Sequence, residues 1–215
     1  MTMAEGATAS ITSDSLGSTD PDTLDPGLKY TVSNMQGGTV LLNNAPLPDN
    51  MFTQAELVAG EVSFEHDGSE GGSASFSFVV SDGVSSTPSE TFSITVTPVN
   101  NGPVVTTNTG MGMTEGARKV IQRSQLWTSD PDTADDSLWY SVASSEGGSV
   151  LLDGQALPGG RFTQAQLLAE LVSFQHDGSE DPTARFTFAV TDGAISSGPH
   201  TFVISLDPSN DPPVV

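Results

Sequence analysis

Short runs of alternating apolar and polar residues recur along the chain, and they predict β-strands. ASFSFVVSDG places Phe76, Phe78 and Val80 on one face, and TFSITV does the same with Phe92 and Ile94. Such alternation is typical of strands that turn one face toward a core. LKYTV, TVLL, EVSF and the opening residues predict further strands. Because Gly, Asp and Pro separate these runs, about seven short strands in roughly 105 residues favour a β-sandwich.

One segment carries a helical signal instead. In FTQAEL, Thr53 can accept from the start of a short helix, and Glu56 follows three residues later, as a capping box requires. The related segment FTQAQL has Gln166 at the same place, and its side chain can serve in the same way. We therefore expect one short helical turn in each half of the chain.

The chain is an internal duplication with a period of 110 residues. Residues 1–105 align with residues 111–215 without a gap, and FEHDGSE at residues 64–70 returns as FQHDGSE at residues 174–180. A repeat of this length is a whole domain rather than a solenoid unit. The fold class is therefore predicted to be all-β, with two tandem sandwiches.

The first predicted domain covers residues 1–101 and the second covers residues 102–215. Each ends in a proline-flanked polar stretch, NNGP or NDPP. Proline fixes φ, so these stretches are expected to be semi-rigid connectors. We expect the chain to be a piece of a longer repetitive protein.

The charge of the chain is strongly negative. Asp and Glu total 27 against 6 Lys and Arg, giving a formal net charge of -21. Such a chain repels nucleic acid and anionic membranes, and its natural counter-charges are cations. The alternative is that the acids only confer solubility. The chain has no cysteine, and we find no signal peptide and no apolar run of about 18 residues that could insert into a membrane.

The recurring histidines, His66 and His176, invite a catalytic interpretation. General acid–base catalysis needs a base beside a nucleophile or a metal with an open position. The chain has no cysteine and neither a G-x-S-x-G nor an H-E-x-x-H motif. We therefore predict that the protein is not an enzyme and that each histidine hydrogen-bonds a loop.

The motifs TEGA, SDPDT, FTQAEL, HDGSE, VSDG and PVNNGP occur in this order along the chain. Their combination resembles the cadherin-like repeats of the chondroitin-sulfate-proteoglycan type, which occur in animal cell-surface proteoglycans and in large bacterial repeats-in-toxin adhesins. The resemblance covers both halves. It implies Greek-key sandwiches in tandem on an extracellular, cell-surface protein, often with calcium at the junctions.

The resemblance also implies where calcium ligands lie. A site at the junction of the two domains would draw on Glu5, Asp67, Glu70, Asn100, Asn101, Asp130, Asp132 and Asp192. Two half-sites would face neighbouring repeats of the same kind: Asp20, Asp22 and Asp82 toward a preceding repeat, and Glu115, Asp177, Glu180, Asn210 and Asp211 toward a following one. The linker departs from the usual pattern because Asn101 stands where an acid is usual, which weakens the junction site.

Elementary chemistry supports the calcium hypothesis without the resemblance. Calcium takes six to eight oxygen ligands. Without a cation, many carboxylates close together repel one another. Turn formation alone is the alternative, because Asp suits turns well. Two tryptophans of the second domain, Trp127 and Trp139, raise a further alternative, the stacking of a glycan or a contact with a partner protein. We expect a monomeric structural segment that spaces an adhesin's binding tip from the cell, with homophilic adhesion left open.

Overall fold

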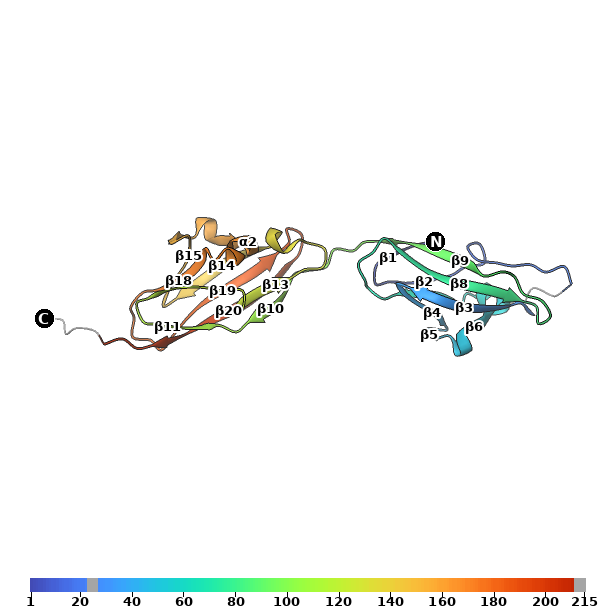
Figure 1. Ribbon diagram of the computed structural model, residues 1–215, viewed down its shortest axis with the longest axis horizontal. Helices are drawn as coiled ribbons and strands as arrows, with labels where there is room; N and C mark the ends of the chain where they lie inside the picture. The colour runs from blue at the N-terminus through green and yellow to red at the C-terminus, as the bar shows by residue number, and fades with distance from the viewer. Residues whose placement is uncertain (23–26, 211–215) are drawn as a thin grey trace. The chain divides into compact units, whose positions relative to one another are not determined.

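A computed structural model of the protein describes residues 1–22 and 27–210 (Figure 1). The chain forms two compact units, unit 1 (Met1–Val99) and unit 2 (Asn100–Val215). The linker asparagines therefore pack with the second unit. Within the described ranges, no helix is long and apolar enough to cross a membrane.

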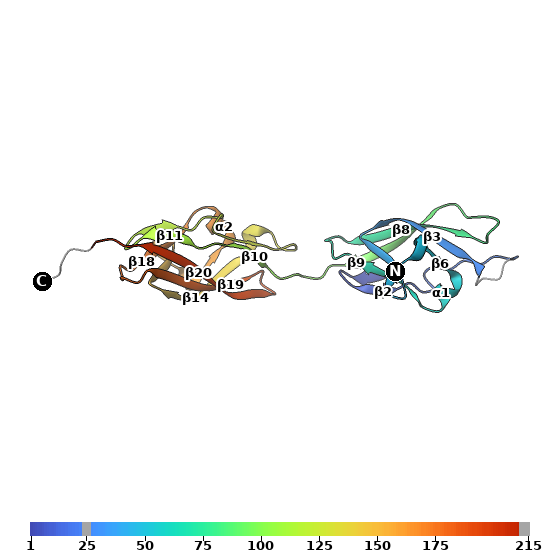
Figure 2. The same ribbon diagram turned by 90° about the horizontal axis from the view of Figure 1, so that it is seen from below.

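Unit 1 is a sandwich of two sheets. Its elements are β1 (Thr2–Ala4), β2 (Thr8–Ser10), β3 (Lys29–Gln36), β4 (Gly38–Leu42), β5 (Ala45–Pro46), η2 (Pro48–Asn50), β6 (Met51–Thr53), α1 (Gln54–Val58), β7 (Val62–His66), β8 (Ser73–Ser81) and β9 (Glu90–Thr97). One sheet has the order β1-β9-β8-β3-β6 and the other β2-β7-β4-β5. Figure 2 shows α1 beside β6, at the edge of the first sheet.

Unit 2 repeats this arrangement and adds one strand pair. Its elements are β10 (Val104–Asn108), β11 (Met111–Thr114), β12 (Arg118–Val120), β13 (Leu126–Ser129), η3 (Asp135–Ser137), β14 (Trp139–Glu146), β15 (Gly148–Leu152), β16 (Gln155–Ala156), η4 (Pro158–Gly160), β17 (Arg161–Thr163), α2 (Gln164–Leu168), β18 (Val172–His176), β19 (Thr183–Thr191) and β20 (Ser196–Asp207). The sheets have the orders β11-β20-β19-β14-β17 and β12-β18-β15-β16, and β10 pairs with β13. The predicted all-β tandem sandwich is confirmed.

The chain passes between the two sheets of unit 1 at a glycine pair. Gly37 has φ +70° and Gly38 has φ +157°, and β3 and β4 on either side of them belong to different sheets. A Cβ at Gly38 would lie 2.2 Å from the carbonyl oxygen of Glu65 and 2.6 Å from the Phe64 ring. Only glycine fits there, and Gly148 repeats the arrangement in unit 2.

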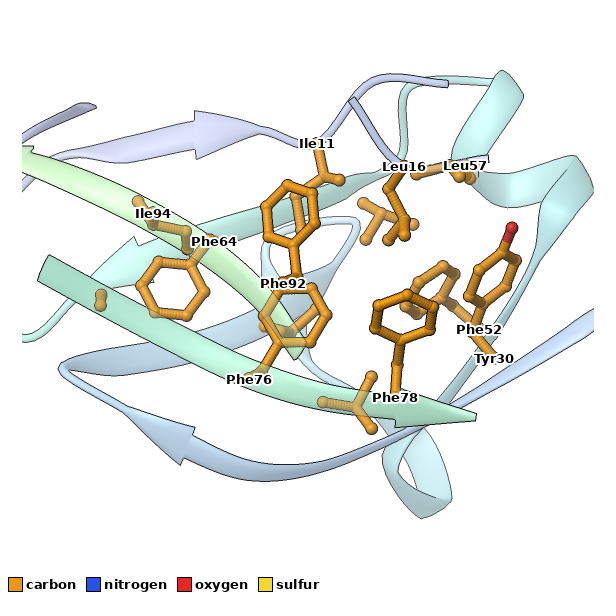
Figure 3. Close-up of a cluster of buried hydrophobic side chains, with 14 of the residues drawn as sticks. Ile11, Leu16, Tyr30, Phe52, Leu57, Phe64, Phe76, Phe78, Phe92 and Ile94 are labelled. Atoms are coloured by element: carbon orange, nitrogen blue, oxygen red, sulfur yellow. The ribbon is translucent and has the colours of Figure 1, made fainter. Parts of the chain in front are cut away.

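The predicted inward residues form the core between the sheets. Figure 3 shows Phe76, Phe78, Phe92 and Tyr30 pointing into one interior of unit 1, and all four are buried. Phe76 stacks on Phe92 with ring centroids 5.1 Å apart. Burial of each such ring contributes about 1.5–3 kcal/mol, so the alternation seen in the sequence is the main source of stability.

The short helices begin as expected. The Thr53 hydroxyl accepts from the Glu56 N–H at 3.2 Å, and the Glu56 carboxylate accepts from the Thr53 N–H at 2.6 Å. In unit 2, Thr163 and Gln166 form the same reciprocal pair. The predicted capping boxes are therefore confirmed in both units.

The described part of unit 1 contains more strands than the seven predicted, because two- and three-residue strands such as β5 and β6 add to the longer ones. Alternation cannot reveal such short strands, since two or three residues do not define a period. They lie at sheet edges and leave the predicted sandwich unchanged.

Candidate metal centre

The SDPDT motif forms a tight acidic turn directly after β13. The Oδ1 atom of Asp130 accepts from the backbone N–H groups of Asp132 and Thr133, at 3.0 and 2.8 Å. Asp130 is buried, and its second carboxylate oxygen, Oδ2, accepts no hydrogen bond from the described residues. A buried acceptor without a partner costs about 1–3 kcal/mol, so this oxygen is a candidate ligand for a cation.

A second acidic turn follows β19. The Oδ1 atom of Asp192 accepts from the N–H groups of Ala194 and Ile195, each at 2.6 Å, and its Oδ2 accepts from the Asn100 side chain at 2.8 Å. The Asn100 amide, followed by the two backbone N–H groups, holds the pKa of Asp192 below its usual range. Asp192 is therefore a carboxylate at neutral pH.

The linker lies across both turns. While Asn100 contacts Asp192, the Asn101 N–H donates to Oδ2 of Asp132 at 2.6 Å. The structure thus brings together five of the eight predicted junction residues within unit 2: Asn100, Asn101, Asp130, Asp132 and Asp192.

The chemistry of this set fits calcium. Carboxylate and amide oxygens are the ligands that calcium prefers, and the chain has no cysteine thiolate to compete with them. Over residues 1–22 and 27–210, no three acidic or histidine side chains are already close enough to hold a metal on their own. The set therefore provides hard oxygens from neighbouring turns, but they would have to move closer together to coordinate a cation.

Unit 1 has the same two acidic turns. Oδ1 of Asp20 accepts from the Asp22 N–H at 2.8 Å, and Oδ1 of Asp82 accepts from the N–H groups of Val84 and Ser85 at 2.7 and 2.6 Å. Backbone N–H groups lower the pKa of Asp82. Turn chemistry alone thus accounts for the Oδ1 contacts in both units, and the unpartnered Oδ2 of Asp130 is what it leaves unexplained.

The remaining predicted ligands of unit 2 that the structure describes lie in its lower loops, the loops that follow β11, β18 and β20. Glu115 accepts from the Ser209 N–H at 3.0 Å and lines a pocket of about 100 Å³ together with Glu180. Ser209 was not predicted from the sequence, because a backbone donor leaves no mark in it. The Ser179 hydroxyl and N–H lower the pKa of Asp177. Asn210 is the last described residue, and Asp211 lies outside the described residues.

Unit 1 repeats this geometry with the three other predicted junction residues. Glu5 is buried, and its N–H donates to the Thr97 carbonyl at 3.0 Å. Asp67 accepts from the Ser69 N–H at 2.9 Å, and the Ser69 side chain and N–H lower its pKa. Glu70 is exposed in the same loop.

The repeated histidine connects the two lower loops of each unit. Nδ1 of His66 accepts from the N–H groups of Gly6 and Gly68, at 3.2 and 3.1 Å. His176 makes the same pair of contacts at 3.0 and 3.1 Å with the matching glycines. Both histidines are buried. Each histidine therefore holds the loop that contains Glu5 or Glu115 beside the HDGSE loop of the same unit. This is the loop-bonding role that we predicted.

The two tryptophans differ. Trp127 is a buried core residue, and the guanidinium carbon of Arg123 lies 4.1 Å from its ring centroid. The expectation that Trp127 could stack a ligand is therefore corrected, because the core and a cation–π partner cover the ring. Trp139 is 45% exposed, in accordance with its predicted direction away from the core.

Comparison with known proteins decides the family. The sequence profile of the cadherin-like family matches residues 1–96 and residues 103–206. The chain belongs to the cadherin-like family. Each sandwich described above is thus one cadherin-like domain, and the predicted family is confirmed at this level.

The cadherin-like chain is similar to extracellular matrix proteins and to a chondroitin sulfate proteoglycan. It is 32% identical over 197 residues to extracellular matrix protein 3 of Lytechinus variegatus, covering 90% of this chain and 6% of that protein. It is 33% identical over 201 residues to human extracellular matrix organizing protein FRAS1 (90% and 5%), and 37% identical over 152 residues to human chondroitin sulfate proteoglycan 4 (67% and 6%). The chain thus spans only 5–6% of the length of these relatives.

Among solved structures, human CDH23 EC21-23 is similar, with a TM-score of 0.48 and 16% identity, covering 97% of this chain and 71% of that one. The family assignment does not depend on this similarity, because the sequence profile already covers both units.

Proposed function

We propose that this chain is a non-catalytic structural segment of a large extracellular adhesin, of the bacterial repeats-in-toxin type, in which calcium at the joints between repeats sets their stiffness. Membership of the cadherin-like family and the names of the matrix relatives support a structural, extracellular role. A chain of tandem sandwiches would space a binding tip from the cell surface.

One observation carries the calcium part of the proposal: Oδ2 of Asp130 is buried and accepts no hydrogen bond from residues 1–22 and 27–210. The carboxylate of Asp192 accepts from the Asn100 side chain and that of Asp132 accepts from the Asn101 N–H, so a cation that engaged Asp130 would have hard oxygens at hand. We propose that Glu5, Asp67 and Glu70 of unit 1 complete the ligand set. The half-site residues of each unit would serve the corresponding joints with other repeats.

Calcium binding of this kind adds stability by mass action, because the folded joint binds the ion and the unfolded chain does not. At a calcium concentration 100-fold above the dissociation constant the gain is about 2.7 kcal/mol. The melting temperature should therefore rise with calcium, and small-angle scattering should report a longer particle because the joint straightens. Chelator should reverse both changes.

Magnesium at equal concentration is the matched control, because its smaller shell and strict octahedral geometry suit such a site poorly. A melting temperature and a maximum dimension that do not respond to calcium would overturn the proposed joint. An equal response to both ions would indicate only charge screening.

A further inference from the structure

The linker segment of unit 2 contains the one Asn-Gly pair of the sequence. Asn101 precedes Gly102, whereas every other asparagine precedes a larger residue. The backbone nitrogen of the next residue can attack an asparagine side chain, and glycine allows this most readily because it has no Cβ to obstruct the approach. Asn101 is exposed, so water has access to this pair.

The packing of unit 2 requires the glycine of this pair. A Cβ at Gly102 would lie 2.7 Å from Cγ2 of Ile195, which belongs to the loop after β19. The next residue, Pro103, is buried. A larger residue at position 102 would therefore have to displace Ile195 or the linker, so the feature that makes Asn101 reactive is imposed by the fold.

The backbone nitrogen of Gly102 is available as a nucleophile. Its N–H donates no hydrogen bond within residues 1–22 and 27–210. The N–H of Asn101, in contrast, donates to Oδ2 of Asp132 at 2.6 Å. The residue that would be attacked is thus held by its own backbone, while the attacking nitrogen has no hydrogen bond to break.

A neighbouring side chain acts on the same peptide group. Nδ2 of Asn100 donates to the carbonyl oxygen of Asn101 at 3.0 Å and to Oδ2 of Asp192 at 2.8 Å. The Asn101 carbonyl and the Gly102 N–H belong to one resonant amide, so loss of the proton places negative charge on that oxygen. A donor already directed at the oxygen stabilises this charge, as preorganised donors do in acyl-transfer sites.

We propose that Asn101 is a site of spontaneous deamidation, promoted by Gly102 and by the Asn100 side chain. The Gly102 nitrogen attacks Cγ of Asn101, its proton passes by way of water to the leaving amino group, and ammonia departs from a cyclic succinimide. Water then opens either carbonyl of the ring and leaves an aspartate or an isoaspartate at position 101. Water is the only co-reactant, and either product adds one negative charge to the linker.

The new carboxylate belongs to the linker segment that contacts Asp132 and Asp192. Its consequence for calcium rests on the proposed function: a further charged oxygen ligand strengthens a calcium site, because the charge of the ligands tunes calcium affinity. In the isoaspartate product the main chain runs through the former side-chain carbon, so the linker is one carbon longer at this point. Deamidation therefore changes both the charge and the length of the joint.

Peptide mass spectrometry of the folded full chain, aged in chelator at neutral and mildly alkaline pH, tests the proposal. Conversion at Asn101 should increase with time and with pH, because alkaline solution removes more of the Gly102 proton, and it should precede conversion at Asn108. Asn100→Ala should slow it about fivefold, the factor expected for one lost hydrogen bond. Gly102→Ala combined with Ile195→Ala, which removes the side chain that the new Cβ would meet, should nearly abolish it.

The same chains aged in denaturant provide the matched control. Unfolding removes the contact of Asn100 with the Asn101 carbonyl, so the wild-type chain and Asn100→Ala should then convert at equal rates. Circular dichroism before ageing checks that the variants fold. Folded protein in which Asn101 stays an amide, or in which Asn100→Ala converts as fast as the wild type, would overturn the proposal.

Calcium titration of Asn101→Asp, which carries the first product, measures the consequence. It should bind calcium more tightly than freshly prepared wild-type chain, whereas Asn101→Gln, which keeps the amide, should not. Equal affinities of Asn101→Asp and the wild type would overturn the effect on the joint and leave the proposed function standing. Absence of calcium binding in all three chains would instead count against the proposed function, because the mass measurement is made without calcium.

Discussion

Replacement of His176 by Leu should destabilise unit 2 through two lost hydrogen bonds. His176 is 2% exposed, and its Nδ1 accepts from the N–H groups of Gly116 at 3.0 Å and Gly178 at 3.1 Å. Leucine keeps the apolar volume but leaves both donors without an acceptor. At about 1 kcal/mol or somewhat more for each donor, the free energy of unfolding should fall by about 2–3 kcal/mol.

The matched variant is His176→Asn. Its side-chain oxygen can stand near the position of Nδ1 and accept from at least one of the two glycines, so it should recover about half of the loss. Both tryptophans of the chain lie in unit 2, so denaturation followed by tryptophan fluorescence reports that unit alone. Amide exchange at Gly116 and Gly178 should accelerate in the Leu variant before global unfolding.

This reasoning is refuted if His176→Leu costs less than about 0.5 kcal/mol, the usual range for a surface substitution. It is equally refuted if Asn and Leu cost the same, because the acceptor would then contribute nothing. The corresponding His66 variants should leave the tryptophan-detected transition unchanged, since His66 belongs to unit 1.

Two further outcomes follow from single contacts. Gly148→Ala should lower the free energy of unfolding by more than about 2 kcal/mol, because the new Cβ would lie 2.2 Å from a carbonyl oxygen. Gly116→Ala, at φ +68° with open space around it, should lower it by only about 1–2 kcal/mol. Equal losses of stability in denaturant would contradict the steric argument. Asn100→Ala should raise the pKa of Asp192 toward its ordinary value and leave that of Asp82 unchanged. Because the pKa of Asp192 is lower in the folded protein than in the unfolded chain, its charged form stabilises the linker contact above the unfolded pKa. This stabilisation is lost as the pH falls through the folded pKa. Carbon-detected NMR titration should therefore show that the wild-type contact persists below the ordinary pKa of an aspartate.

The sandwich could be predicted from the sequence because its core is a periodic pattern. Phe76, Phe78 and Val80 alternate with polar residues, and all three are buried as expected. Because the same positions recur 110 residues later, each strand predicted in the first half was also predicted in the second. The pairing of β10 with β13 was not predicted, because alternation identifies strands but not their partners.

The candidate site was harder to predict, because turns and calcium sites use the same residues. Asp20 and Asp130 look alike in sequence and both accept from turn N–H groups. Only the structure shows that Oδ2 of Asp130 is buried and has no hydrogen-bond partner in the part of the chain that is described. Trp127 shows the opposite difficulty: a large aromatic residue in a polar stretch suggested a ligand, but Arg123 and the core cover it.

Isothermal titration of calcium into the full chain and into Asp130→Asn tests the central claim most directly. Asn keeps the shape and the Oδ1 turn contacts of residue 130 but removes the charge from the buried oxygen. The account predicts saturable binding to the wild-type chain, with loss of at least one site or at least a tenfold weaker affinity, about 1.4 kcal/mol, in the variant. Identical isotherms for the two proteins, or no binding at millimolar calcium, would contradict it.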